Sequence, residues 1–136
     1  MRVFILDDIP QRHDNIKLYL RSRNIGTEFE WFSAQTYLEG VTQFREQGPF
    51  DLLCLDHDLG DYDPEVATRS PAATGYAGGR GGFLDGVDFC HFLRNRNTAP
   101  TDVWVHSWNP EGANRMVGLL RDDGHRVTVQ PAPGEV

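Results

Sequence analysis

The sequence predicts a single α/β domain built on a mostly parallel sheet. Three continuous apolar runs, each of which stops at charged or polar residues, indicate strands that are buried on both faces. Stretches with a helical period of apolar residues separate these runs, and this alternation implies right-handed crossovers between parallel strands. A chain of 136 residues is long enough to bury a hydrophobic core without a metal or a disulfide.

The first half of the chain contains two predicted strand–helix units. Residues 3–6 form the first apolar run, and Pro10 suits the first turn of the helix that follows. Residues 29–31 alternate between apolar and acidic side chains, as a half-exposed strand does. We expect Ser33 to cap the next helix, which ends where Gly48 breaks the apolar period.

The second half repeats this alternation twice and ends on a strand. Residues 52–55 and 103–105 form the other two buried runs. Helical periods over residues 87–93 and 113–120 follow them, and residues 127–129 alternate like a second half-exposed strand. Three buried strands and two edge strands fit the order 2-1-3-4-5, so we expect a flavodoxin-like three-layer sandwich.

Two segments depart from a regular sandwich, although the whole chain, 1–136, is expected to be one domain. Residues 59–84 form a glycine-rich insertion after strand three, with no apolar period. Residues 131–136 form a proline-containing tail that is too short for a final helix. A missing helix exposes apolar surface on one face of the sheet, where we expect a homodimer contact or a partner protein.

Composition excludes several classes of protein. Hydrophobic residues make up 39% and charged residues 24%, which is a globular balance rather than a collagen-like, coiled-coil or wholly disordered one. The net charge of −7 argues against an extended nucleic-acid surface, but leaves a short phosphate-bearing end or a nucleotide open. We expect no membrane segment, no signal peptide and a cytoplasmic location, with Cys54 and Cys90 as reduced core thiols.

Ionisable side chains gather where the buried strands end. In an open parallel sheet, ligands bind beyond the carboxyl ends of the strands, at the point where the strand order reverses. Carboxylates gathered there repel one another, and a divalent cation would neutralise them while leaving positions for phosphate oxygens. Polar strand ends also occur simply because the chain reaches water. The residues at this edge are Asp7, Asp8, Asp56, His57, His106 and Ser107.

Other side chains near this edge have two interpretations each. Arg12 either clamps a phosphate or pairs with an acidic neighbour, and Asn109 either caps a helix or binds the ligand. Asp58 is a candidate for a further metal-binding carboxylate. Arg80 lies within the glycine-rich insertion, which is either a lid whose backbone amides contact substrate or a flexible connection.

The two strand-end histidines suggest proton transfer. Opening a cyclic phosphodiester needs an activated water, charge stabilisation on the non-bridging oxygens and a proton for the leaving oxygen. Because imidazoles titrate near neutral pH, we expect His57 and His106 to face one pocket and divide the acid and base roles. Two alternatives are that one imidazole binds the metal, or that each one hydrogen-bonds a neighbouring carboxylate.

The acidic residues and their spacing resemble the receiver domain of response regulators. The match consists of Asp7-Asp8 after the first strand, Asp56 after the next buried strand, Asp85-Gly86 at a helix start and Ser107 after strand four. In that family the acidic pair holds Mg²⁺, the third Asp accepts a phosphoryl group and the hydroxyl senses it. The resemblance does not extend to ordinary phosphotransfer, because Gln130 precedes Pro131 where the family has a lysine.

Residues 55–60 (LDHDLG) and 106–109 (HSWN), together with Arg12, resemble a divergent group, the cyclic-phosphate processing receiver domains of bacteria and phages. This resemblance implies action on cyclic phosphates. We therefore expect a metal-dependent hydrolase acting on an RNA 2′,3′-cyclic phosphate end or a cyclic nucleotide, with Mg²⁺ or Mn²⁺, or else Zn²⁺. The alternative is a non-enzymatic atypical receiver or a phospho-ligand-binding module.

The expected roles can be assigned residue by residue. The expected metal ligands are Asp7, Asp8, Asp56 and Asp58. The expected catalytic residues are His57, His106 and Asp56, and the expected substrate-binding residues are Arg12, Ser107, Asn109 and Arg80.

Overall fold

The main sheet has five parallel strands in the order β2-β1-β3-β6-β7. The computed structural model describes residues 1–59, 61–62 and 83–134. The strands are β1 (Arg2–Leu6), β2 (Glu30–Ala34), β3 (Leu52–Leu55), β6 (Asp102–Val105) and β7 (Arg126–Val129). The order 2-1-3-4-5 expected from three buried and two edge strands is confirmed.

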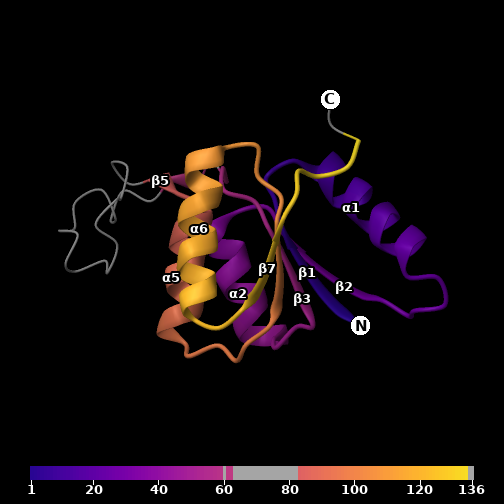
Figure 1. Cartoon of the computed structure of the whole chain (residues 1–136), viewed down its shortest axis with the longest axis horizontal. Coiled ribbons are helices and arrows are strands. Elements are labelled where there is room, and N and C mark those ends of the chain that lie inside the picture. The colour runs from indigo at the N-terminus through magenta and orange to yellow at the C-terminus, as the bar shows by residue number, and fades with distance from the viewer. Residues whose placement is uncertain (60, 63–82, 135–136) are drawn as a thin grey trace.

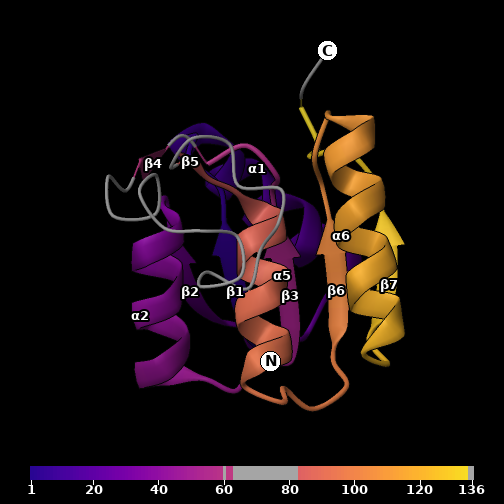
Figure 2. The same ribbon diagram turned by 90° about the vertical axis from the view of Figure 1, so that its left-hand side faces the viewer.

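The four helices among the described residues cover the sheet unequally. One face carries α1 (Pro10–Arg23) alone, and the other carries α2 (Tyr37–Gln47), α5 (Gly86–Asn95) and α6 (Pro110–Asp122). Figure 2 shows these three helices in front of the sheet, with α1 behind it. None of the helices within the described residues is long and apolar enough to cross a membrane.

The sheet divides the hydrophobic core in two because strand side chains alternate between faces. Ile5 and Cys54 belong to the smaller cluster beneath α1, whereas Phe4 and Cys90 belong to the larger cluster beneath the three other helices. Both cysteines are buried and free, as expected. The central strands are therefore apolar on both faces, which explains their continuous apolar runs.

The predicted insertion, residues 59–84, is described only at its two ends. There β4 (Asp61–Tyr62) and β5 (Phe83–Leu84) pair as a short antiparallel ladder. The remainder of the insertion, including Arg80, lies outside the described residues.

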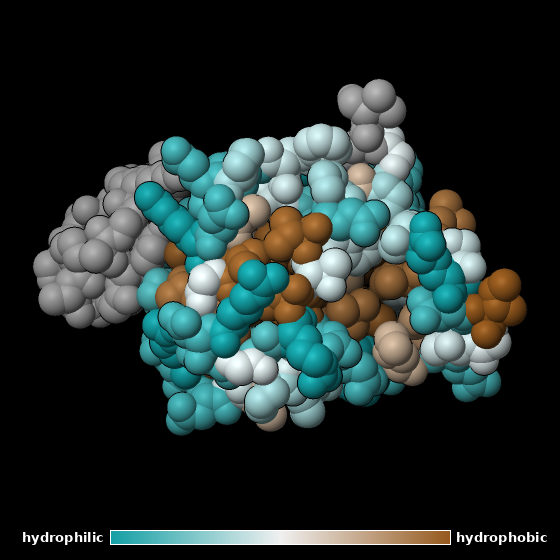
Figure 3. All heavy atoms as spheres, in the orientation of Figure 1, coloured by the Kyte–Doolittle hydropathy of each residue, from teal (hydrophilic) through white to brown (hydrophobic). Residues whose placement is uncertain are grey.

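The tail partly takes the place of a final helix. No helix follows β7 among the described residues, as expected. The Trp104 indole donates a hydrogen bond to the Gln130 carbonyl (2.6 Å), and Ala132 is buried in the cluster beneath α1. The tail thus covers part of the face that was expected to need a partner. Val129 on the edge strand is exposed. In Figure 3, hydrophobic residues (brown) reach the surface near the middle of the face that is turned toward the viewer.

The start of α2 differs from the sequence prediction. Ser33 lies within β2, paired in register with Ile5, and the ladder continues to Ala34. The cap is Thr36, whose hydroxyl accepts a hydrogen bond from the Glu39 amide (3.1 Å). Pairing with β1 therefore extends the strand past the residue that helix-capping rules selected, and the next hydroxyl along the chain takes that role.

Replacing these two hydroxyls separately tests the assignment. We expect Thr36→Ala to lower the free energy of unfolding by about 1 kcal/mol, because an amide of the first turn loses its acceptor. Ser33→Ala, on an exposed strand position, should change it by less than about 0.5 kcal/mol. Urea denaturation of both variants measures the difference, and equal losses would contradict the cap.

Candidate functional site

Three of the predicted site residues follow the central strands in one row. β1 and β3 pair Leu6 with Leu55, and β3 and β6 pair Leu55 with Val105. Two backbone hydrogen bonds extend this ladder one residue further, from the Asp56 amide to the Leu6 carbonyl and from the His106 amide to the Leu55 carbonyl (both 3.0 Å). The next residue of each strand, Asp7, Asp56 and His106, therefore stands on the face that α1 covers.

The side chains of this row, here called the central cluster, form a buried group of possible metal ligands. One ligand atom of each of Asp7, Asp56 and His106 lies within 4.8 Å of the others. The Asp7 Oδ2 and His106 Nδ1 atoms are 3.5 Å apart, and each residue is at most 1% exposed. Asp7 Oδ2 and both ring nitrogens of His106 have no hydrogen-bond partner among the described residues.

Helix α1 brings a cation to the central cluster. The Arg12 Nη1 atom lies 3.6 Å from Asp7 Oδ1 and 3.4 Å from Asp56 Oδ2. The Arg12 side chain is partly exposed, so it faces both the cluster and solvent. His13 anchors this turn by donating from Nε2 to the Asp7 carbonyl (2.8 Å). His13 was not among the residues predicted for the site, although its spacing to Ile16 places it on the buried face of the helix.

Burial sets the protonation of the central cluster. Burial raises the pKa of Asp7 to about 6, and Asp8 adds to this increase, whereas the Ile9 amide and Arg12 lower the pKa. Burial together with the nearby Asp7 charge raises the pKa of Asp56 to about 7. Burial lowers the pKa of His106 to about 3, so its imidazole is neutral at pH 7.

The structure does not bring His57 and His106 together, so the expectation of one shared pocket does not hold. His57 follows Asp56 by one residue and therefore points to the opposite face of the sheet. Its Nδ1 lies 2.8 Å from Asp58 Oδ1, and its Nε2 lies 3.2 Å from Asp85 Oδ2. The close contact with the Asp85 carboxylate, supported by Asp58, raises the pKa of His57, which favours an imidazolium between two carboxylates.

The remaining predicted residues that the structure describes lie around the central cluster without joining it. Asp8 is partly exposed beside Asp7, and Asp58 is an exposed partner of His57. Asn109 caps α6, since its Oδ1 accepts from the Gly112 amide (3.0 Å). Ser107 is buried, and its hydroxyl accepts a hydrogen bond from the Asn109 amide (3.0 Å).

Two glycines that sequence analysis did not explain hold the strand ends against helices. A side chain on Gly86, at the start of α5, would overlap the Asp56 carbonyl, and one on Gly112 would overlap the His57 ring. Asp85 caps α5 through Oδ1 and contacts His57 through Oδ2. The Asp85-Gly86 pair was recognisable in the sequence as a helix start. The contact between Asp85 and His57 could not be inferred, because the insertion separates the two residues along the chain.

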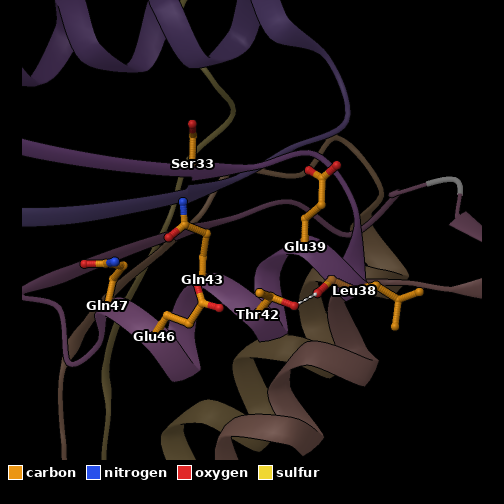
Figure 4. A pocket seen from close by; sticks show the side chains of 7 residues that line it. All are labelled: Ser33, Leu38, Glu39, Thr42, Gln43, Glu46 and Gln47. Carbon is orange, nitrogen blue, oxygen red and sulfur yellow. Dashed lines mark hydrogen bonds between the residues drawn. The ribbon is translucent and has the colours of Figure 1, made fainter.

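A cavity of about 580 Å³ lies elsewhere, between α2 and β2 (Figure 4). Its lining residues are Ser33, Leu38, Glu39, Thr42, Gln43, Glu46 and Gln47. None of them belongs to the central cluster. Two glutamates and no cation line this cavity, so its charge does not suit a phosphate.

Alanine substitutions at two glycines of α6 test the packing of His57. We expect Gly112→Ala to be destabilising, because its methyl group would collide with the His57 ring. Gly118→Ala meets no atom within 4 Å and should stabilise the same helix by about 0.5–1 kcal/mol through its higher helix propensity. Thermal unfolding measures both, and a stable Gly112→Ala variant would contradict the placement of His57.

The raised pKa of Asp56 predicts that replacing this residue with asparagine increases the stability of the folded protein more at high pH than at low pH. An Asp whose folded pKa is about 7 and whose ordinary pKa is 3.8 loses its stabilising contribution as pH rises through this window. In chelator, Asp56→Asn should therefore be more stable than the wild type at pH 8, by on the order of 2 kcal/mol, with a smaller difference at pH 5. Exposed Asp122→Asn is the control, and a pH-independent difference at Asp56 would refute the prediction.

Comparisons with solved structures show the fold. A receiver domain from Rhodospirillum rubrum matches with 14% identity and a TM-score of 0.61, over 99% of this chain and 82% of that chain. A CheY-like receiver domain from Methanospirillum hungatei JF-1 matches with 18% identity and a TM-score of 0.56, over 98% and 82%. The Mn²⁺-bound form of response regulator Rcp1 matches with 13% identity and a TM-score of 0.58, over 99% and 83%.

Sequence comparison shows the family. No curated protein matches the sequence. Among the matching structures, the chain spans 65% of a longer one, a yeast Spc42 coiled-coil fusion. The family model of the cyclic-phosphate processing receiver domain matches residues 1–122, which include α1, α2, α5, α6 and the central cluster. The chain therefore belongs to the cyclic-phosphate processing receiver domain family.

Proposed function

We propose that this protein is a metal-dependent hydrolase of cyclic phosphates whose centre is the Asp7–Asp56–His106 cluster. One observation carries the proposal: Asp7 Oδ2 and both ring nitrogens of His106 are buried without a hydrogen-bond partner among the described residues. Buried polar atoms are normally satisfied, and a bound cation would satisfy Asp7 Oδ2 and one of the two His106 ring nitrogens. Arg12 adds a partly exposed positive charge beside them, where a phosphate would approach.

The donor set fits a divalent cation. Two carboxylates suit Mg²⁺ and Mn²⁺, and an imidazole adds affinity for transition metals such as Mn²⁺ and Zn²⁺. His106 is neutral at pH 7, as a ligating imidazole must be. Rcp1, which shares the fold, has been solved in an Mn²⁺-bound form. We assign Asp7, Asp56 and His106 as the ligands and favour Mn²⁺ or Mg²⁺.

The surrounding residues supply the other requirements of hydrolysis. A divalent cation contributes Lewis-acid chemistry and lowers the pKa of a water molecule. During hydrolysis of the cyclic phosphate, the water oxygen forms a bond to phosphorus and one P–O bond of the ring breaks. The leaving oxygen gains a proton, and the product is a monophosphate. The Arg12 guanidinium neutralises charge on the non-bridging oxygens. The Ser107 hydroxyl accepts a hydrogen bond from the Asn109 amide and so orders the chain that follows His106.

His57 has a positioning role in this proposal. Its backbone amide donates to Asp56 Oδ1 (2.9 Å), and its ring is held by Asp58 and Asp85. Since the ring lies on the opposite face from the central cluster, it fixes the strand end that carries Asp56 rather than transferring a proton.

Turnover and thermal shift together test the proposal. We expect Mn²⁺ or Mg²⁺ to raise the melting temperature of the wild type and to support hydrolysis of a nucleoside 2′,3′-cyclic monophosphate, both of which EDTA abolishes. Asp7→Asn should lose the thermal shift and turnover. Arg12→Gln should lower turnover about a hundredfold, as the loss of a charge-stabilising group does. Exposed Asp122→Asn is the control and should keep both signals, and Asp58→Asn should keep the thermal shift.

Each contrary outcome has a distinct meaning. A thermal shift that depends on Asp7 without turnover would favour the atypical receiver or phospho-ligand-binding module. The absence of any shift with Mg²⁺, Mn²⁺ or Zn²⁺ would remove the metal centre. A shift lost in Asp58→Asn and kept in Asp7→Asn would place the cation on the His57 side of the sheet.

A further inference from the structure

Strand β2 stands at one edge of the sheet, with half of its backbone groups turned outward. Among the described residues, its only partner strand is β1. The Glu30 amide donates a hydrogen bond (2.9 Å) and the Ala34 carbonyl accepts one (3.1 Å) on the β1 side. Successive residues of a strand direct their backbone groups to alternate edges, so those of Trp31 and Ser33 face away from β1. An edge of this kind can pair with a further strand.

A negatively charged groove lies beside this open edge. It is the cavity of about 580 Å³ between α2 and β2, and Figure 4 shows Glu39 and Gln43 rising from α2 toward β2. Glu46, two turns after Glu39, lines the same groove. Neither glutamate forms an ion pair with a described residue, although Glu39 accepts a hydrogen bond from the Gln35 amide (2.9 Å). The α2 side of the edge therefore attracts cations.

The α1 side of the same edge is positively charged. The Trp31 side chain packs against the core cluster beneath α1. The Lys17 ammonium lies 6.0 Å and the Arg21 guanidinium 5.4 Å from the centre of its ring. Asp14, the one acidic residue of α1, lies one turn before Lys17, so the two cations outnumber it.

Charges of opposite sign therefore flank the edge, one on each face of the sheet. Arg2 also lies on the α2 side, 4.6 Å from the centre of the Phe32 ring, but it pairs with Glu30 (3.0 Å) and adds no net charge. Side chains of an added strand would point alternately to the two faces. Basic side chains would suit the α2 side of such a strand, and acidic side chains would suit the α1 side.

The spacing of the groove glutamates fits this alternation. Glu39 and Glu46 are separated by about 10 Å along the helix axis, at 1.5 Å per residue. Side chains on one face of a strand recur about every 7 Å. A strand with a basic residue at every second position therefore brings one basic side chain near each glutamate.

The charges disfavour a second copy of this chain as the added strand. Antiparallel pairing of two β2 edges follows a twofold axis perpendicular to the sheet, which places α1 beside α1 and α2 beside α2. The cations at Trp31 would then face their own copies, and so would the groove glutamates. Like charges that oppose each other across an interface weaken binding.

We propose that β2 and the α2–β2 groove bind an extended segment of a partner protein in which basic and acidic side chains alternate. Its main chain pairs with the outward backbone groups of Trp31 and Ser33 as a further strand of the sheet. Its basic side chains meet the groove glutamates, and its acidic side chains meet Lys17 and Arg21. None of these residues belongs to the central cluster, so this inference does not rest on the proposed function.

Two peptides of equal composition test the alternation. The probe is a fluorescein-labelled octapeptide that alternates Lys and Glu, and its control carries four Lys followed by four Glu. Both are uncharged overall, so the net charge of −7 of the protein attracts them equally. We expect the alternating peptide to bind at least about tenfold more tightly in fluorescence anisotropy at low salt, because only its strand sorts the charges onto two faces.

Methylated peptides test the main-chain pairing. In an added strand the amides of either all Lys or all Glu residues face β2, because the direction alternates along the chain. We therefore expect N-methylation of one of these two sets to abolish binding and N-methylation of the other set to leave it. Loss in both peptides, or in neither, would overturn strand addition.

Variants of the protein locate the surface. Glu46→Lys and Arg21→Glu should each weaken binding of the alternating peptide several-fold, whereas Asp122→Lys, exposed at the end of α6, should not. Ser33→Pro should abolish binding and keep the wild-type circular dichroism spectrum, because it removes an amide that faces away from β1.

The contrary outcomes are equally specific. Equal affinity for the alternating and block peptides would overturn the proposal, as would unchanged binding in both Glu46→Lys and Arg21→Glu. A dimer in sedimentation velocity that Ser33→Pro dissociates would make a second copy the occupant and overturn the assignment of a different partner.

Discussion

The register of β1, β3 and β6 is the constraint on which the rest of this molecule depends. It aligns the residues that follow Leu6, Leu55 and Val105, so that Asp7, Asp56 and His106 share one face of the sheet. A shift of one residue in any strand would turn its ionisable side chain to the other face. The apolar runs fix this register, because each apolar residue of the three strands must face a core cluster above or below the sheet.

The same burial that makes the sheet stable makes its end electrostatically unfavourable. Burial raises the pKa of Asp7 to about 6 and that of Asp56 to about 7, and it leaves the His106 imidazole neutral. Ionising both carboxylates therefore costs folding free energy, which Arg12 offsets only in part. A cation that binds between the two carboxylates would recover this folding free energy. The electrostatic cost at the strand ends is therefore a reason to expect a positive ligand there.

Close helix contacts keep the strand ends in place. Gly86 allows the start of α5 to approach the Asp56 carbonyl, and Gly112 allows α6 to approach the His57 ring. His57 in turn contacts Asp85 at the cap of α5. The residue after Asp56 thus joins two helices on the far face of the sheet, while Asp56 itself faces Arg12 and α1. Neighbouring residues with opposite orientations connect the central cluster to both layers.

The sequence alone determined the five strands of the main sheet, their order, the helices that the structure describes and the end of the sheet at which ionisable groups gather, because apolar periods are local and the handedness of crossovers is general. Only the tertiary structure decided which of these groups meet. His57 and His106 both follow buried strands, yet Asp56 aligns with His106, so His57 falls on the other face and pairs with Asp85 across the insertion. In the same way, pairing with β1 drew Ser33 into β2 and left the cap to Thr36. A single residue of offset reverses the direction of a strand side chain, and that offset is set by contacts between segments far apart in the chain.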